Sequence, residues 1–239
     1  MYGGSTFRVE DGAAPVDLVI SGNLWMNGGA WQSIYKRGAG TLKLTATGGP
    51  TLNNEHAFEL SEGVTLCDNA SGSPLGNAKV KVNAGAMLGG CGFIGGTELG
   101  DVSVSGTAAK PAVIAPGSID EETGVHLYGT LTVGTASHTN NVAFGADSKL
   151  RVAIGPRGQA DSLRVLGAID LSGSTDSLEI VLPDTAENVR GGTYVLAYAS
   201  EGITGSFDAV VQPIPNSYLS RTANEIILTC RAPTVILLR

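Results

Sequence analysis

Short segments in which apolar and polar residues alternate recur along the chain and predict β-strands. In TLKLT, residues 41–45, Leu42 and Leu44 alternate with polar residues, a period of two that is typical of a strand with one buried face. The same period occurs in residues 80–82, 102–104, 131–133, 150–154, 163–165 and 178–182. Gly, Asn, Asp and Ser lie between these segments and predict turns. No segment has the helical spacing of apolar residues over three turns, so the chain is predicted to be all-β.

Part of this pattern is an imperfect internal repeat. AFELSEGVTL, residues 57–66, aligns with KVKVNAGAML, residues 79–88, at an offset of 22 residues. The alignment pairs Phe58 with Val80, Leu60 with Val82, Gly63 with Gly85, Val64 with Ala86 and Leu66 with Leu88. A further 22 residues along the chain, the two valines map onto Val102 and Val104. Repeat periods of about 20 to 50 residues are typical of solenoids.

Stacking of such repeats predicts a parallel β-helix. One unit of this length cannot bury its apolar positions alone, but layers about 4.8 Å apart give each inward side chain a neighbour above and below. Leu42 and Leu44 would then point inward, and Thr41, Lys43 and Thr45 outward. At roughly 20 to 25 residues a layer, the chain would form about ten layers. The alternative is an antiparallel β-sandwich, which also has short strands and Gly-rich turns but gives no reason for the 22-residue register.

We expect one β-helical domain over residues 1–239, with three parts. Residues 1–35 are predicted to form an N-terminal cap or edge, residues 36–192 the repeat layers and residues 193–239 a C-terminal capping unit. The last part has the densest apolar segments and the larger side chains Tyr194, Tyr198 and Phe207, and Pro213, Pro215 and Pro233 would interrupt its strand pairing. We therefore expect this end to be the most stable. Trp25, Trp31 and Tyr35 are interpreted as capping the other end, with sugar stacking as the alternative.

Composition narrows the possible partners. Gly occupies 34 positions and only 15% of residues are charged, which disfavours a helical protein with charged faces. The net charge is -7 and there is no basic cluster, so we expect no nucleic-acid partner. The longest apolar run, residues 235–238, is far shorter than the roughly 20 residues of a membrane-spanning helix, and none is expected. No secretory signal pattern is recognised in the first residues either.

The side chains that could carry chemistry are dispersed. Residues 120–122 (Asp-Glu-Glu) share one loop and are predicted to form a solvated turn, with Ca²⁺ binding as the alternative; Asp161 precedes a strand and is predicted to cap a turn. His56, His126 and His138 accompany no Gly-x-Ser-x-Gly nucleophile motif. The sequence therefore predicts no catalytic residues, no cofactor and no metal site.

The three cysteines match no zinc-binding spacing, because there is no Cys-x-x-Cys pair. Cys67 and Cys91 lie 24 residues apart, two more than the repeat, which would place them on adjacent layers with a diagonal displacement. A layer spacing of about 4.8 Å lies within the Cα separations that a disulfide tolerates, about 4.4 to 6.8 Å. We therefore consider a disulfide between Cys67 and Cys91, with two buried free thiols as the alternative.

Several stretches in order resemble the C-terminal part of an autotransporter passenger. KRGAGTLKLTATGG, residues 36–49, is similar to the autotransporter-associated β-strand repeat, with its Gly-x-Gly-Thr-Leu-x-Leu-Thr core and following Gly turn. The later stretches are PLGNAKVKVNAGAMLGGCGFIGG, AVIAPGSI, GTLTV, ADSLRVLGAIDLSG and GTYVLAYASEGITGSFDAV. The resemblance covers roughly residues 36–211. It implies a right-handed parallel β-helix at the bacterial cell surface, associated with the outer membrane or released outside the cell.

The expected function is that of a non-catalytic surface or secreted protein, a stalk or adhesin-type passenger segment. Its expected partners are host or surface glycans or other surface proteins. One alternative is a carbohydrate-active β-helical enzyme, because polysaccharide lyases and hydrolases also use β-helices. The other is a module that promotes folding or export of a larger passenger.

Overall fold

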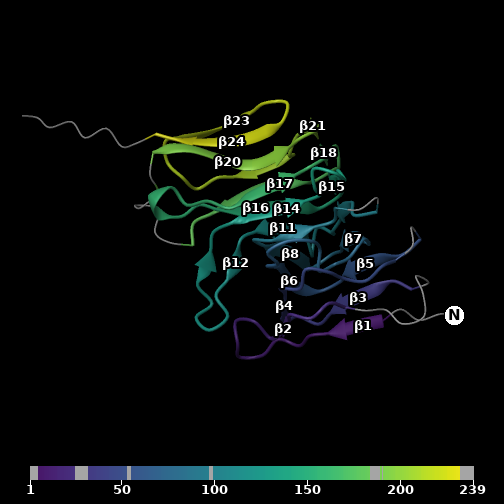
Figure 1. Ribbon diagram of the computed structural model, residues 1–239. Coiled ribbons are helices and arrows are strands. Elements are labelled where there is room, and N and C mark those ends of the chain that lie inside the picture. Colours follow the sequence, from purple (N-terminus) through teal and green to yellow (C-terminus); the bar gives the residue numbers. More distant parts are fainter. Residues whose placement is uncertain are drawn as a thin grey trace, which may run out of the picture.

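The computed structural model describes residues 5–24, 32–52, 55–96, 99–183, 189 and 191–231. Its regular structure is β throughout these ranges except for one 3-10 turn, η1 (Pro156–Gly158), which confirms the all-β prediction. The strands stack in three sheets that run along the molecule (Figure 1). In the described part of the chain, no helix has the length and apolar character needed to cross a membrane.

Two sheets of eight strands, sheet A and sheet B, are parallel throughout. Sheet A contains, in spatial order, β1 (Ser5–Arg8), β3 (Ile34–Arg37), β5 (Ala57–Leu60), β7 (Lys79–Val82), β10 (Val102–Val104), β15 (Val142–Phe144), β18 (Ala168–Leu171) and β21 (Gly202–Gly205). Sheet B contains β2 (Leu18–Ile20), β4 (Thr41–Leu44), β6 (Gly63–Cys67), β8 (Ala86–Gly90), β11 (Ala112–Pro116), β16 (Ser148–Ala153), β19 (Ser177–Val181) and β22 (Ala209–Val211).

Sheet C has six strands and ends in antiparallel pairing. It contains β9 (Phe93–Ile94), β14 (Thr130–Val133), β17 (Ser162–Val165), β20 (Gly192–Ala199), β24 (Glu225–Cys230) and β23 (Ser217–Arg221). The pairs from β9 to β20 are parallel, and β20, β24 and β23 pair antiparallel. A separate antiparallel hairpin joins β12 (Ser118–Ile119) to β13 (His126–Leu127).

The chain visits the sheets in a repeating order. It alternates between sheets A and B up to β8, and from β9 onward it also adds strands to sheet C. Each passage adds one strand to a sheet beside the strand from the previous passage, and we call one such passage a layer. Stacked parallel sheets are consistent with a β-solenoid, and they do not favour the antiparallel β-sandwich.

The predicted register is right in sheet A and off by one residue in sheet B. Phe58 pairs with Val80 and Val80 pairs with Val102, as the 22-residue offset predicts. In sheet B, however, Val64 pairs with Met87, and Leu66 with Gly89, so the aligned pairs that began at residue 63 were wrong. The reason is the turn between the strands, which has two residues after β5 but three after β7.

The layers are also fewer and less uniform than expected. Within the described ranges, sheets A and B each contain eight strands, where about ten were expected. The number of residues from one layer to the next varies. Lys81 and Glu59, which form a hydrogen bond between neighbouring layers, are 22 residues apart in the sequence, whereas Asn141 and Asp101, which also do so, are 40 residues apart. The longest layer contains the β12–β13 hairpin. Insertions between strands thus lengthen some layers and lower the number of layers that the described residues form.

Like side chains stack in rows through the core. The inward row of sheet A is apolar in every layer from β3 onward, and none of its residues is more than 6% exposed: Ile34, Phe58, Val80, Val102, Val142, Ile169 and Ile203. Leu42 and Leu44 are fully buried as predicted. In the corrected register, Leu42 stacks on Thr65, which is also fully buried.

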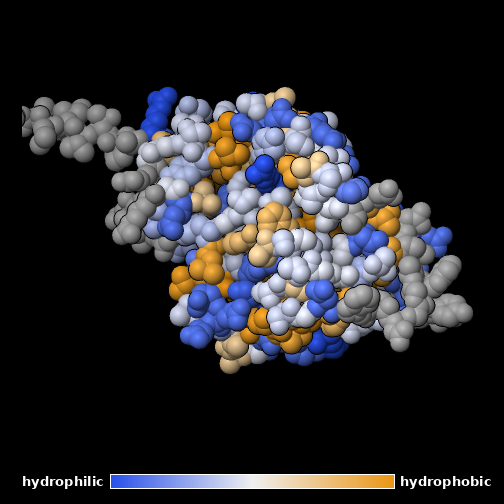
Figure 2. Space-filling view, viewed as in Figure 1, coloured by the Kyte–Doolittle hydropathy of each residue, from blue (hydrophilic) through white to orange (hydrophobic). Residues whose placement is uncertain are grey.

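The two ends of the stack differ. At one end, β1 and β2 are the edge strands of sheets A and B, and Leu18 and Val19 are about two-fifths exposed, at 39% and 41%. Figure 2 shows an apolar patch at this end, in the lower part of the view. At the other end, the antiparallel strands β23 and β24 extend sheet C, within the segment predicted as a capping unit. Trp25, Trp31 and Pro233 lie outside the described residues, and Tyr35 lies in β3.

A buried lysine ties neighbouring layers together. Lys36 on β3 is fully buried, and its Nζ donates hydrogen bonds to the carbonyl oxygens of Gly38 at 2.7 Å, Gly40 at 2.6 Å and Glu62 at 2.7 Å. Gly63 has a φ of 67°, and a Cβ there would lie 2.4 Å from this Nζ, so the turn needs glycine. Desolvation lowers the pKa of Lys36 to about 8, although Glu62 and Asp17 oppose the shift.

We expect Lys36→Met to lower the free energy of unfolding by about 2 to 4 kcal/mol, because the buried carbonyls of Gly38 and Gly40 and the partly buried carbonyl of Glu62 lose their donor. Lys81→Met is the control, since Lys81 makes an ion pair with Glu59 on the surface and its side chain is 48% exposed. Urea unfolding of both variants at neutral pH measures the difference. Equal stabilities of the two variants would contradict the role given to Lys36.

The stability difference between the wild type and Lys36→Met should also depend on pH. The unfolded chain binds this proton more tightly than the folded protein, because the pKa falls from 10.5 to about 8 on folding. The free energy of unfolding of the wild type therefore rises with pH between these two values. We expect the difference in this free energy between the wild type and Lys36→Met to grow over the same pH range. Urea unfolding from pH 7 to pH 10.5 measures it, and a constant or shrinking difference would argue against the lowered pKa.

Candidate functional site

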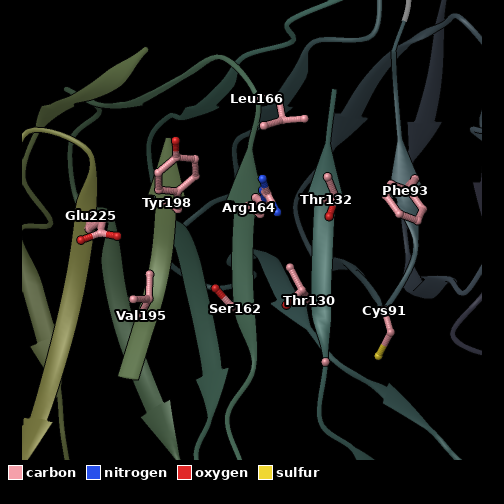
Figure 3. Close-up of a pocket in the computed structure, with 11 residues that line it drawn as sticks. Cys91, Phe93, Thr130, Thr132, Ser162, Arg164, Leu166, Val195, Tyr198 and Glu225 are labelled. Atoms are coloured by element: carbon pink, nitrogen blue, oxygen red, sulfur yellow. The ribbon is translucent and has the colours of Figure 1, made fainter. Parts of the chain in front are cut away.

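A long open groove lies on the outer face of sheet C. Its volume is about 780 Å³, and the lining residues come from five strands, β9, β14, β17, β20 and β24, with further residues at their ends. The lining residues combine aromatic, aliphatic, hydroxyl and charged side chains: Cys91, Phe93, Gly129, Thr130, Thr132, Ser162, Arg164, Leu166, Val195, Tyr198 and Glu225. We call this surface the sheet C groove (Figure 3).

Five of these residues form one row across the groove. Strand register pairs Phe93 with Thr132, Thr132 with Arg164, Arg164 with Tyr198 and Tyr198 with Glu225. In Figure 3 they lie on neighbouring strands at one level, from Phe93 on the right to Glu225 on the left. With strands about 4.8 Å apart, the two aromatic rings are separated by roughly 14 Å along the row.

Arg164 is the cation of this row. It is exposed, and its guanidinium carbon lies 5.9 Å from the centre of the Tyr198 ring, on the next strand. No carboxylate of the described residues lies within ion-pair distance of it. Thr130 and Ser162, paired on β14 and β17, place two hydroxyl groups beside this row. The groove therefore offers a cation, hydroxyl groups and aromatic surface to a ligand.

The second candidate surface is the β12–β13 hairpin, which folds over the outer face of sheet B. A cavity of about 240 Å³ lies between them, and its lining includes Leu66, Met87 and Ile119 together with His126 and Asp161. The hairpin explains why Lys43 is only 7% exposed although it points outward from β4 as predicted.

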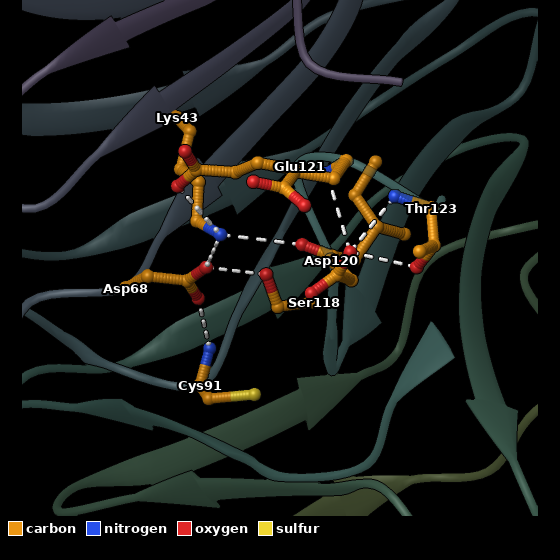
Figure 4. A network of polar contacts seen from close by, with 9 residues as sticks. Lys43, Asp68, Cys91, Ser118, Asp120, Glu121 and Thr123 are labelled. Atoms are coloured by element: carbon orange, nitrogen blue, oxygen red, sulfur yellow. Dashed lines mark hydrogen bonds and ion pairs between the residues drawn. The ribbon is translucent and has the colours of Figure 1, made fainter. Parts of the chain in front are cut away.

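One polar network anchors the hairpin to sheet B (Figure 4). Lys43 Nζ lies 3.2 Å from a carboxylate oxygen of Asp68 and 3.2 Å from one of Glu121, and it also donates a hydrogen bond to the carbonyl of Ile119 at 3.2 Å. The Ser118 hydroxyl donates to Asp68. Burial alone would lower the pKa of Lys43, but the two carboxylates raise it overall, so the side chain stays charged.

A second anchor joins the hairpin to the start of β17. The Asp161 carboxylate is 1% exposed and lies 2.9 Å from His126 Nε2. It also accepts hydrogen bonds from the backbone N–H of Gly129 at 3.0 Å and of Ala153 at 3.2 Å. Asp161 thus holds together three separate segments, which is more than the turn cap that was predicted.

The acidic loop at residues 120–122 is a turn of this hairpin. Asp120 accepts hydrogen bonds from the backbone N–H and hydroxyl of Thr123, at 2.8 Å and 2.6 Å, and these bonds lower its pKa. Glu121 pairs with Lys43 instead of facing its two acidic neighbours. In the described residues, no group of three or more His, Cys, Asp or Glu side chains is arranged to hold a metal ion.

The structure does not join Cys67 to Cys91. The backbone N–H of Gly92 donates to the carbonyl of Cys67 at 2.8 Å, so the two cysteines do lie on adjacent layers. Cys67 is buried in the core and Cys91 faces outward at the groove, and both thiols are free, as is Cys230. Their sequence separation places them on adjacent layers, but their side chains point in opposite directions, so they do not form the disulfide that was considered.

The Cys91 thiol is packed although the residue is exposed. Its Sγ lies 3.7 Å from the carbonyl oxygen of Leu127, and a Cβ on Gly129 would lie 2.3 Å from it. Burial of the sulfur, with the nearby charges of Asp68 and Asp161, raises the pKa of Cys91 to about 12. This thiol is therefore protonated at neutral pH and is a poor nucleophile.

Comparison of the sequence with known protein families and curated proteins assigns no function to this chain. No family model matches this sequence, and no curated protein matches it significantly.

We expect the unfolded, unreduced protein to titrate three thiols, because all three cysteines are free. In the folded protein, iodoacetamide at pH 8 should alkylate Cys91 at least tenfold more slowly than free cysteine, since its pKa of about 12 leaves little thiolate. Mass spectrometry of quenched samples measures both quantities. A count of one thiol, or fast labelling of Cys91, would contradict the structure.

We expect Asp161→Ala to lower the free energy of unfolding by about 3 kcal/mol, because it breaks a buried hydrogen-bonded network. Hydrogen exchange at β12 and β13 should become faster, since the hairpin loses one of its two anchors. Asp101→Ala is the matched control: Asp101 is exposed and accepts a single backbone hydrogen bond, from Asn141 at 2.8 Å. Unchanged exchange of the hairpin in Asp161→Ala would rule out this anchor.

Proposed function

We propose that this chain is a segment of a right-handed parallel β-helix in a bacterial surface or secreted protein of the autotransporter passenger type. Its role is to extend away from the cell and to bind partners, without catalysis. The support comes from the parallel stacking of the layers and from the resemblance of residues 36–211 to passenger repeats. Solenoids of this kind present long continuous outer surfaces, which suits extension and binding.

The observation that carries the binding role is the sheet C groove. Its row of Phe93, Arg164 and Tyr198 exposes groups that recognise ligands, at positions set by the strand register. The expected partners are host or surface glycans or other surface proteins. The expected location is the cell surface, associated with the outer membrane or outside the cell.

One observation favours the alternative of a carbohydrate-active enzyme. His126 and Asp161 form a hydrogen-bonded pair beside the 240 Å³ cavity, and such a pair is a common general base. Asp161 also accepts two backbone hydrogen bonds, however, and these give the pair a structural role in holding the hairpin. We therefore rank the binding protein first.

Localisation of the full-length gene product tests the surface role. We expect an antibody against this segment to label intact producing cells or their medium, and protease added to intact cells to remove the cell-bound signal. A cytoplasmic enzyme serves as the control for cell integrity. A signal that is protected until the cells are broken would overturn the proposal.

Turnover assays separate the binding protein from the enzyme. We expect no increase in reducing ends or unsaturated products when the protein is incubated with a broad panel of polysaccharides. Turnover that Asp161→Ala abolishes would establish the enzyme instead, provided that the variant remains folded by circular dichroism.

A further inference from the structure

We propose that the sheet C groove binds an acidic, uronate-containing oligosaccharide that lies across the strands, along the row from Phe93 to Glu225. This inference rests on the proposed binding function and names the ligand class of that groove.

The direction of the row disfavours a peptide. Extended peptides usually bind by adding a strand to a sheet edge, where unpaired backbone groups receive them. The groove instead crosses β14, β17 and β20, each of which already pairs on both sides. A peptide lying across them would find side chains but no strand backbone to satisfy its own N–H and C=O groups. An oligosaccharide has no backbone of this kind, and its hydroxyl groups can bond to side chains.

The surface of the row suits sugar rings. Phe93 is 36% exposed, and Tyr198, three strands away, is partly buried. Aromatic faces carry partial negative charge, and the C–H groups on one face of a pyranose pack against them. Thr132 lies between the two rings in the row but is only 8% exposed, whereas Thr130 and Ser162, beside the row on β14 and β17, place two hydroxyl groups in the groove that can donate and accept hydrogen bonds. The groove thus offers two aromatic surfaces about three strands apart with hydroxyl groups on the strands between them, which suits a linear chain of sugars.

The positive charge of Arg164 favours an acidic sugar over a neutral one. Arg164 is exposed near the middle of the groove, and the described residues offer it the Tyr198 ring but no ion pair. A guanidinium binds a carboxylate through two parallel hydrogen bonds, and the ring beside it limits its freedom. Glu225 at one end of the row would repel a carboxylate. A uronate is therefore best placed at Arg164, with the neighbouring sugars extending toward Phe93 and away from Glu225.

Isothermal titration of the purified chain with hexagalacturonate tests the proposal, with maltohexaose as the neutral probe of equal length and hexaglutamate as the acidic peptide. We expect hexagalacturonate to bind at least tenfold more tightly than either control, and its affinity to fall as salt is raised. Equal binding of maltohexaose would remove the role of the charge. Equal or tighter binding of hexaglutamate would make the site a peptide site, and absence of hexagalacturonate binding at millimolar concentration would overturn the proposal.

Variants locate the site. We expect Arg164→Gln to weaken hexagalacturonate binding at least tenfold and Tyr198→Ala at least fivefold. The control is Tyr218→Ala, because Tyr218 and Arg231 form a similar pair, 5.7 Å from ring centre to guanidinium, outside the groove lining. Binding that Tyr218→Ala weakens as much as Tyr198→Ala does would refute the location. Circular dichroism and thermal unfolding confirm that each variant is folded.

The outcome can be read separately from that of the proposed function. A surface-exposed protein whose groove does not bind hexagalacturonate keeps the surface role and loses the ligand. A protein that binds it at Arg164 but stays inside the cell, or cleaves polysaccharides, keeps the ligand and loses the surface or non-catalytic role.

Discussion

The structure depends on in-register parallel stacking, because no layer can bury its apolar side chains alone. Each inward residue packs between the residues at the same position of the layers before and after it, as Val80 packs between Phe58 and Val102. Backbone hydrogen bonds between the layers fix this register. Since successive side chains of a strand point to opposite faces, a shift of one residue would exchange the core for the surface. Fixing the inward rows therefore fixes the outward rows as well.

This constraint directs variation to the turns and the outer faces. Steps between layers range from 22 residues to 40 without breaking the inward rows, because the extra residues leave the stack at a turn. The β12–β13 hairpin is the largest such addition in the described chain, and it folds back over sheet B. Its anchors use charged groups that would be costly to bury unpaired: Lys43 meets Asp68 and Glu121, and Asp161 meets His126.

The alternation and the repeat spacing of the sequence predicted the positions of several strands and part of their pairing. The strands around Leu42, Val80 and Leu163 follow from alternation, and the pairing of β5 with β7 and of β7 with β10 in sheet A follows from the 22-residue spacing. The predicted register of sheet B was wrong by one residue, because the turn after β7 is one residue longer than the turn after β5. Alternation alone does not show at which residue a strand begins after a turn. Side-chain direction likewise separates Cys67 from Cys91, although their spacing alone suggested a disulfide.

The sheet C groove could not be predicted from the sequence, for a related reason. Its row joins Phe93, Thr132, Arg164, Tyr198 and Glu225, which are separated by irregular steps because the turns and the hairpin differ from layer to layer. No fixed period connects them, and the sequence pattern places Tyr198 only among the large side chains of the C-terminal segment. The recognisable sequence pattern lies in the inward residues of the same strands, in which Leu131 pairs with Leu163 and Val133 with Val165. Because alternation places Thr132 and Arg164 on the opposite face from these residues, the apolar core of the layers determines which side chains meet in the groove.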